Sequence, residues 1–410
     1  MAETSPAPGI LRGLKVLEIT HFIAGPFCAR VLADMGAEVV KVEPPGKGDP
    51  LRDWGLKLEG QSVWWSVASR NKKCVTLNMK SAEARPILDK LVAWADVLVE
   101  NFRPGQLEKW GLGWDAIQRL NPRCILARIS GFGQDGPYRD KVAFGAIGEA
   151  MGGIRYLTAH PPEVSDLPPV RTGIALADDI ASIYAVSGIL AAVYERDVVG
   201  TGKGRVIDVA LYEGVFSFLE GSLPEYGKFG HVRRPEGSTL PTAAPSNAYR
   251  TKDQQWLIIA GNSDLIVQRL LRLIGHPELA GEPRFASNAE RVKHRGELDR
   301  LIGAWVATQE IAAAEHALQL ADVPVGRVYT IKDCAEDPHY QARGMIQEVA
   351  DPRLGPILHP GPVPRFDPSG PGTRIAWAGP ALGQHNREVY GAIAGLGPEQ
   401  LARLSQAGVV

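Results

Sequence analysis

Short apolar runs rich in β-branched residues alternate with helical patterns over the first half of the chain, and this alternation constrains the fold more than any other feature. The runs predict strands at 14–20, 38–43, 74–79, 97–101, 124–130 and 205–211. Helices are predicted between them, at 25–36, 81–94 and 114–120. Strands that alternate with helices form parallel sheets with right-handed crossovers. The expected fold class is therefore α/β, with a Rossmann-like, doubly wound sheet.

The carboxyl ends of the strands are where such a sheet binds ligands. The turns expected there are 21–25, 44–48, 101–105 and 131–137. The first turn reads T-H-F-I-A-G-P and lacks G-x-G-x-x-G, which argues against a bound NAD. GTGKG, at 200–204, joins a helix to a strand, whereas a P-loop joins a strand to a helix, so it is interpreted as a turn.

The second half of the chain begins with a loss of periodicity near 224–245. Beyond it, a small α+β domain is expected, with strands at 256–260 and 325–331 and helices at 264–274, 297–306 and 311–320. A hairpin is predicted at 352–362 and a helical tail at 386–406. We therefore divide the chain into a large domain, 1–223, a small domain, 224–331, and a segment, 332–410, that returns to the large domain.

The composition limits the kinds of partner and ligand that can be expected. The 45 basic and 46 acidic residues nearly cancel and form no basic tract, so no nucleic acid is expected. The first residues show no export signal, and no apolar run reaches the ~18 residues that span a bilayer, so no membrane is expected. Four cysteines without C-x-x-C spacing indicate reduced thiols in a cytoplasmic protein. The nine histidines lack ligand spacing, so no metal is expected.

Asp178 and Asp179 open an otherwise apolar helical run. Aspartate is favoured at a helix N-terminus, because its carboxylate accepts free backbone N–H groups and meets the positive end of the helix dipole. The simplest interpretation is a cap. The alternative is an ionised carboxylate that faces a cleft and acts as a nucleophile or base. The local sequence leaves both interpretations open.

Two other stretches are candidates for ligand binding. NFRPG, at 101–105, follows a predicted strand and offers an amide, an aromatic ring and a guanidinium. The pair Trp64-Trp65 is suited to stack a purine, with Lys72 and Lys73 near its phosphates, although core packing is expected for at least one of the two indoles.

Several stretches, in this order, resemble the class III CoA-transferases, the group that includes formyl-CoA transferase, carnitine CoA-transferase and the α-methylacyl-CoA racemases. They are LRGLKVLEITHFIAGPFCARVLADMGAEVVKVEPPGKGD, NKKCVTLNMKS, ADVLVENFRPGQLEKWGLGWDAIQRLNPRCI, GFGQDGP, ADDIASIYAVSGILAAVYER and GTGKGRVIDVAL. The resemblance implies a large Rossmann-like domain, a small domain, and a homodimer of interlocked subunits. It also implies acyl-CoA and small carboxylic acids as substrates, with no permanently bound cofactor.

The family nucleophile is an aspartate ten residues before the glycine of G-[IM]-L-A-A, which corresponds to Asp178, ten residues before Gly188. Asp179 keeps the cap interpretation. The implied reaction passes through an aspartyl anhydride and an aspartyl-CoA thioester. The resemblance also carries over CoA contacts, with Arg103 added from the NFRPG turn: His21, Ile23, Leu77, Met79, Asn101, Phe102, Arg103, Lys109, Trp110 and Lys141.

The resemblance admits two alternatives. The racemases use a histidine where this chain has Phe144, and a phenyl ring cannot exchange a proton, so a racemase is disfavoured. A catalytically silent CoA-binding subunit is disfavoured because Asp178 is retained. FGAIGEAMGG and LPEYGKFG resemble relatives that move CoA between succinate and other dicarboxylic acids. A distal carboxylate needs a cation, for which Arg155, Arg233 and Arg234 are candidates.

Overall fold

The computed structural model describes residues 9–366 and 372–410. The chain forms two compact units. The larger comprises 1–155, 172–227 and 339–410, and the smaller 156–171 and 228–338. We expected a small domain at 224–331, whereas the smaller unit runs from 228 to 338 and also includes residues 156–171, which we assigned to the large domain. Each unit is described by itself.

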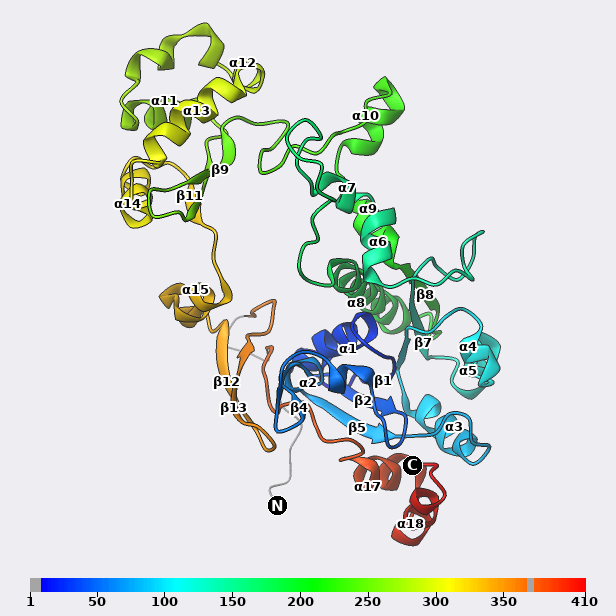
Figure 1. Ribbon diagram of the computed structural model, residues 1–410. Helices are drawn as coiled ribbons and strands as arrows, with labels where there is room; N and C mark the ends of the chain where they lie inside the picture. The colour runs from blue at the N-terminus through cyan, green and yellow to red at the C-terminus, as the bar shows by residue number, and fades with distance from the viewer. Residues whose placement is uncertain (1–8, 367–371) are drawn as a thin grey trace. The chain divides into compact units, whose positions relative to one another are not determined.

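A parallel sheet of six strands forms the centre of the larger unit, in the order β5-β2-β1-β6-β7-β8 (Figure 1). The expected α/β class is confirmed. β5 begins two residues earlier than the sequence indicated, because buried Lys72 is part of the strand. The strands are β1 (Lys15–Ile19), β2 (Glu38–Glu43), β5 (Lys72–Thr76), β6 (Val97–Glu100), β7 (Ile125–Ser130) and β8 (Val206–Ala210).

Helices cover both faces of this sheet, as a doubly wound fold requires. Side chains alternate along each strand, so Val16 and Leu17 of β1 enter two different cores. The core with Val16 contains α1 (Ala24–Asp34) and α8 (Leu176–Asp197). The core with Leu17 contains α3 (Ala84–Trp94) and α5 (Trp114–Leu120). Figure 1 shows α1 and α8 on one side of the sheet and α3 on the other.

The C-terminal segment returns to the core that contains Leu17, as expected, but it is not one helix. It divides into α17 (Asn386–Val389), a π-helical turn (Tyr390–Ala394) and α18 (Pro398–Gln406). The break falls at Gly395, whose φ of +68° ends the turn, and at Pro398, which starts the last helix. Tyr390 anchors the segment, because its hydroxyl donates to the Thr76 carbonyl at 2.6 Å.

The other elements of the larger unit are short. They are β3 (Lys57–Leu58), β4 (Gln61–Ser62), α2 (Val63–Ala68), α4 (Gln106–Lys109), α6 (Gly145–Met151), α9 (Leu211–Ser217), and the hairpin of β12 (Ile346–Asp351) and β13 (Gly355–Pro360). A 3₁₀ turn covers Pro50–Asp53. Three helices lie where the chain passes from one unit to the other: α7 (Ile154–Leu157), α10 (Ser222–Phe229) and α16 (Pro338–Ala342).

The smaller unit packs helices on an antiparallel sheet in the order β11-β10-β9. Its core joins Leu257 and Ile259 of β10 to Leu298 and Ile302 of α13. Its strands are β9 (Ser246–Arg250), β10 (Trp256–Ala260) and β11 (Val325–Arg327). Its helices are α11 (Asp264–Leu273), α12 (Asn288–Lys293), α13 (Arg295–Val306), α14 (Ile311–Leu320) and α15 (Ile331–Glu336), with 3₁₀ turns at Pro277–Gly281 and Pro283–Phe285.

Helix α8 corrects one sequence expectation. Among the described residues it is long and apolar enough to span a bilayer, although no apolar run of that length was expected. The difference arises because its few charges lie near its two ends. α8 supplies Ala181, Ala185 and Ile189 to the sheet core, and we describe it as a core helix of a globular protein.

Candidate active site

A cavity of about 210 Å³ lies at the carboxyl edge of the sheet, beside the start of α8. Its walls come from the turns after β1, β6 and β7 and from the segment before α6. The doubly wound fold predicts a ligand at this edge. Six predicted site residues line the cavity together: His21, Asn101, Phe102, Arg103, Lys141 and Asp178. Phe144, at the position of the racemase histidine, lines it too.

Asp178 is the third residue of α8, and the surrounding backbone fixes its position. The Ser182 hydroxyl lies 2.6 Å from the Asp178 carbonyl and 2.5 Å from the Ala24 carbonyl, which ties α8 to α1. On the other side, Asp178 packs against Gly145, the first residue of α6. A Cβ added at Gly145 would lie 1.9 Å from Asp178 Oδ2. The carboxylate therefore occupies space that only a glycine at 145 leaves open.

Asp179 does not cap the helix, which corrects the sequence interpretation. The N-cap is Ala175, no side chain caps this end, and the Asp179 N–H already donates within the helix to the Ala175 carbonyl. Burial raises the pKa of Asp179 to about 6, and the nearby Arg30 offsets only part of this rise. Asp179 lines a second cavity, of about 240 Å³, together with Arg30.

The turn after β1 is held by the turn after β6. The side-chain amide of Asn101 accepts from the His21 N–H at 2.9 Å and donates to the His21 carbonyl at 2.8 Å. Beside this pair, three rings pack edge to face. The centroids of His21 and Phe102 are 5.0 Å apart, and those of Phe102 and Trp110 are 4.9 Å apart. Trp110 therefore supports the cavity wall from behind.

A buried ion pair fixes Phe102. Glu100 is fully buried; its Oε1 accepts from Arg128 at 2.7 Å, and its Oε2 accepts from the Phe102 N–H at 2.8 Å. Burial raises the pKa of Glu100 to about 7, although Arg128 and the Phe102 N–H lower it. The ion pair thereby joins the side chains of β6 and β7 next to the cavity wall.

A second buried network fixes Phe22, whose φ of +63° is unusual for a bulky residue. Asp49 Oδ1 accepts from the Phe22 N–H at 3.1 Å, and Asp49 Oδ2 pairs with Lys41 at 2.8 Å. Lys41 also pairs with Glu18 at 2.7 Å, and all three charged side chains are fully buried. Burial lowers the pKa of Lys41, but Asp49 and Glu18 more than offset this, and the pKa is raised overall.

The other predicted CoA contacts lie outside the first cavity. Ile23 lines the second cavity. Leu77 is buried in the sheet core, where only its backbone can meet a ligand, and Met79 packs against the same core. Lys109 lies on the exposed surface of α4.

The three arginines expected at the acceptor are placed differently from one another. Arg155 pairs at 2.5 Å with Glu149, whose side chain is fully buried. Arg234 is in the smaller unit and pairs with Glu163 on the surface. Arg233, also in the smaller unit, has interactions of its own. None of the three lines either of the two cavities that adjoin Asp178 and Asp179.

Sequence reasoning missed several residues at these cavities, among them two arginines and an aromatic ring. Arg139 and Phe22 line the first cavity, and Arg30 lines the second. Arg139 stands only two residues before Lys141, which was predicted, whereas Arg30 is hidden in the regular pattern of α1. The core packing expected for at least one of the two indoles is confirmed at Trp65, and Lys72 is not available to a ligand phosphate. Trp65 is buried and donates to the Pro380 carbonyl, and Lys72 pairs with buried Glu18 at 2.8 Å.

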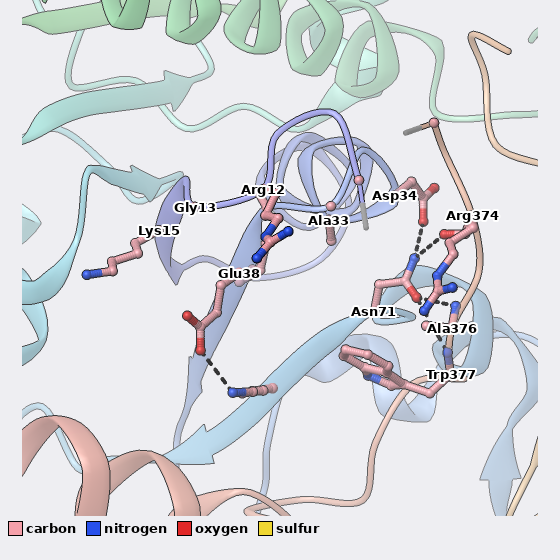
Figure 2. Close-up of a pocket in the computed structure, with 16 residues that line it drawn as sticks. Arg12, Gly13, Lys15, Ala33, Asp34, Glu38, Asn71, Arg374, Ala376 and Trp377 are labelled. Carbon is pink, nitrogen blue, oxygen red and sulfur yellow. Dashed lines mark hydrogen bonds and ion pairs between the residues drawn. The ribbon is translucent and has the colours of Figure 1, made fainter. Parts of the chain in front are cut away.

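A further cavity, of about 270 Å³, lies at the opposite, amino-terminal edge of the sheet (Figure 2). Arg12, Lys15 and Arg374 line it, and Asn71 closes one side by donating to the Arg374 carbonyl at 2.8 Å. Since ligands of doubly wound sheets bind at the other edge, we do not assign the active site here.

Within 9–366 and 372–410, no three His, Cys, Asp or Glu side chains are grouped to hold a metal ion.

Fold and site together define an α/β protein that presents a carboxylate in a cavity at the carboxyl edge of a parallel sheet. The model of CoA-transferase family III matches residues 11–386. The chain is 47% identical over 404 residues to a succinyl-CoA–D-citramalate CoA-transferase of Chloroflexus aurantiacus, with 98% of each chain covered. It is 33% identical to a succinyl-CoA:glutarate CoA-transferase of Mus musculus, over 92% of this chain and 85% of that one.

Among solved structures, a CAIB/BAIF family protein from Brucella suis superimposes with a TM-score of 0.82 and 32% identity, over 95% of this chain and all of that one. The chain belongs to CoA-transferase family III. It is a class III CoA-transferase with acyl-CoA substrates, which confirms the resemblance seen in its sequence.

Proposed function

We propose that this enzyme moves CoA from succinyl-CoA to a small dicarboxylic acid, with Asp178 as its nucleophile. The observation that carries the proposal is the position of the Asp178 carboxylate, in one cavity with His21, Asn101 and Phe102 and against the start of α6. The substrates are suggested by relatives that are named for succinyl-CoA with citramalate or glutarate.

The reaction is a pair of acyl transfers at Asp178. The carboxylate attacks the thioester carbon, the C–S bond breaks, and CoA thiolate leaves a mixed anhydride. The thiolate then attacks the Asp178 carbonyl carbon, which releases the donor acid as its carboxylate and leaves an aspartyl-CoA thioester. The acceptor carboxylate attacks this thioester and expels the thiolate, and the thiolate attacks the acceptor's acyl carbon. The product is a new acyl-CoA, and Asp178 is regenerated.

The surroundings of Asp178 suit these steps. Each attack places negative charge on a carbonyl oxygen, and the N–H groups of Gly145 and Ala146, the first two of α6, have no acceptor within their own helix. We propose that they meet this charge, because Gly145 brings the helix start against the carboxylate. The cations Arg103, Arg139 and Lys141 line the same cavity and would meet CoA phosphates.

A homodimer is part of the proposal. Large apolar side chains of α8 and α9 are exposed in the single chain, including Ile183 (48%), Tyr194 (60%) and Phe216 (44%). Such a face normally marks a protein interface. Size-exclusion chromatography with light scattering should give twice the 44.3 kDa chain mass, and a monodisperse species of the single-chain mass would contradict the dimer.

The buried thiols of Cys28, Cys74 and Cys124 fit a reducing compartment, and we place the enzyme in the cytoplasm.

The nucleophile is tested by mass spectrometry. Protein incubated with succinyl-CoA and quenched in acid should carry a CoA adduct on the peptide that contains Asp178. Asp178→Asn should lose both the adduct and CoA exchange, whereas Asp115→Asn, on the exposed side of α5, should keep both. An Asp178→Asn enzyme with normal exchange would refute the assignment.

A further inference from the structure

The second cavity lies beside the first and is built differently. It is formed by α1, α2, the segment before α8, and α8 itself. Most of its lining is apolar, including Ile23, Phe27, Trp64 and Ile174. Arg30 and Asp179 are its charged residues. Its volume, about 240 Å³, suits a small organic acid.

Arg30 is poorly satisfied in this cavity. Its Nε is buried and has no hydrogen-bond partner, and among the described residues its guanidinium forms no ion pair. The ring of Phe27, 4.4 Å from the guanidinium carbon, packs against it. The nearby Asp34 is already engaged, by Arg70 at 2.7 Å and Asn71 at 2.8 Å. A buried guanidinium nitrogen without an acceptor is costly, and a carboxylate bound to the Arg30 guanidinium would reduce that cost.

The two cavities share Phe22 in their linings. Asp178 lines one and Asp179 the other, because successive residues of a helix point about 100° apart. A short acid whose reacting carboxylate is at Asp178 can therefore extend past Phe22 toward Arg30. The aliphatic carbons of such an acid would contact the apolar lining.

We infer that the second cavity is the acyl subsite, and that Arg30 binds the distal carboxylate of a dicarboxylic substrate. This inference rests on the proposed function. The role that the sequence suggested for Arg155, Arg233 or Arg234 would then belong to Arg30. Asp179, the one acid in the lining, opposes this binding and limits its strength.

The test compares glutarate with monomethyl glutarate, which has the same carbon chain but lacks the distal charge. Succinyl-CoA is the donor for both. In this ping-pong reaction, kcat/KM for the acceptor measures the reaction of the acceptor with the aspartyl-CoA enzyme. Its value therefore does not depend on the donor. Wild-type enzyme should prefer glutarate. Arg30→Gln should lower kcat/KM for glutarate by roughly 10- to 100-fold, the effect of a lost charged hydrogen bond, and leave the monoester nearly unchanged.

Two further variants sharpen the test. Arg30→Lys keeps the charge but loses the planar guanidinium, so it should retain part of the preference for glutarate over the monoester. If Arg30→Gln does not fold, Arg30→Lys is the variant that tests the inference. Asp179→Asn removes a like charge and should raise kcat/KM for glutarate. An equal loss for both acids in the Arg30 variants, or no loss for either, would overturn the inference while exchange itself persists. A wild-type enzyme that transfers CoA to no acid would instead refute the proposed function.

Discussion

Asn101 holds the backbone of His21 by both atoms of its side-chain amide, with hydrogen bonds of 2.9 and 2.8 Å. The two residues are 80 positions apart and follow neighbouring strands, β6 and β1. These two hydrogen bonds join the turns that follow β1 and β6, beyond the last backbone hydrogen bond between the two strands. They also place the His21 ring against Phe102. A residue that the sequence marked as a CoA contact is thus engaged with protein backbone.

Asn101→Ala should destabilise the fold by about 1–3 kcal/mol, because it leaves the partly buried His21 amide without partners, and should also raise the KM for acyl-CoA. Asn121 is a matched control, since its side chain binds the Ala95 carbonyl at 2.8 Å, away from the cavity. Urea unfolding and steady-state kinetics should show that Asn121→Ala loses stability alone. Equal effects of both variants on KM would contradict the positioning role.

Gly145→Ala should displace the Asp178 carboxylate, because the new Cβ would lie 1.9 Å from Oδ2. A shift of about 1 Å at a reacting group costs on the order of 100-fold in rate. We expect such a loss in kcat with little change in thermal stability. A Cβ added at Gly296, on α13, would meet no atom within 4 Å, so Gly296→Ala should leave kcat unaltered. Normal turnover in Gly145→Ala would show that the contact is not needed.

Lys41→Met should be strongly destabilising. It leaves the carboxylates of Glu18 and Asp49 buried with one cation fewer, and the loss of one partner from a buried pair costs roughly 3–5 kcal/mol. The comparison is Lys57→Met, which removes a surface pair with Asp53 and should cost less than about 1 kcal/mol. Urea midpoints measure both. Similar midpoints for the two variants would argue against a structural role for the buried network.

Asp179 makes stability depend on pH. The pKa of its carboxyl is raised by burial from 3.8 to about 6 in the folded protein, so the folded state binds more protons than the unfolded chain between these values. Its contribution to stability therefore falls as pH rises from about 4 to about 6 and stays low above that. Asp179→Asn should raise Tm more at pH 8 than at pH 5. A Tm difference that is the same at both pH values would refute the raised pKa.

The sheet could be predicted from the chain because each strand is a short apolar run bounded by turn residues, and β2 and β10 were placed to the residue. Lys72 misled the prediction at β5, because a buried lysine reads as a surface residue until its partner, Glu18, is known. The prediction of a single helix over 386–406 was wrong at Gly395, because leucine and alanine continue a helical pattern there while the backbone leaves the helix.

The candidate site was predictable only in part. Asp178 follows from the resemblance, and the turns at His21 and Asn101 follow from the edge of a parallel sheet. Arg30 and Asp179 are far apart in the chain, and nothing in either local pattern shows that they meet one cavity. Their pairing depends on how α1 and α8 pack, which periodicity does not encode. The homodimer, likewise, was inferred from resemblance and stays a prediction.

The return of the C-terminal segment to the core of Leu17 affects how the protein can be made. Val389, Tyr390 and Leu404 cover side chains that belong to residues 17–126. At about 5–20 residues per second, a ribosome needs roughly 13–50 s to travel from residue 126 to residue 386. For that time α3 and α5 cover this apolar side of the sheet in the nascent chain, but the part that Val389, Tyr390 and Leu404 later cover stays exposed. The yield of folded protein should therefore depend on chaperones that shield the unfinished sheet, more than its final stability would indicate.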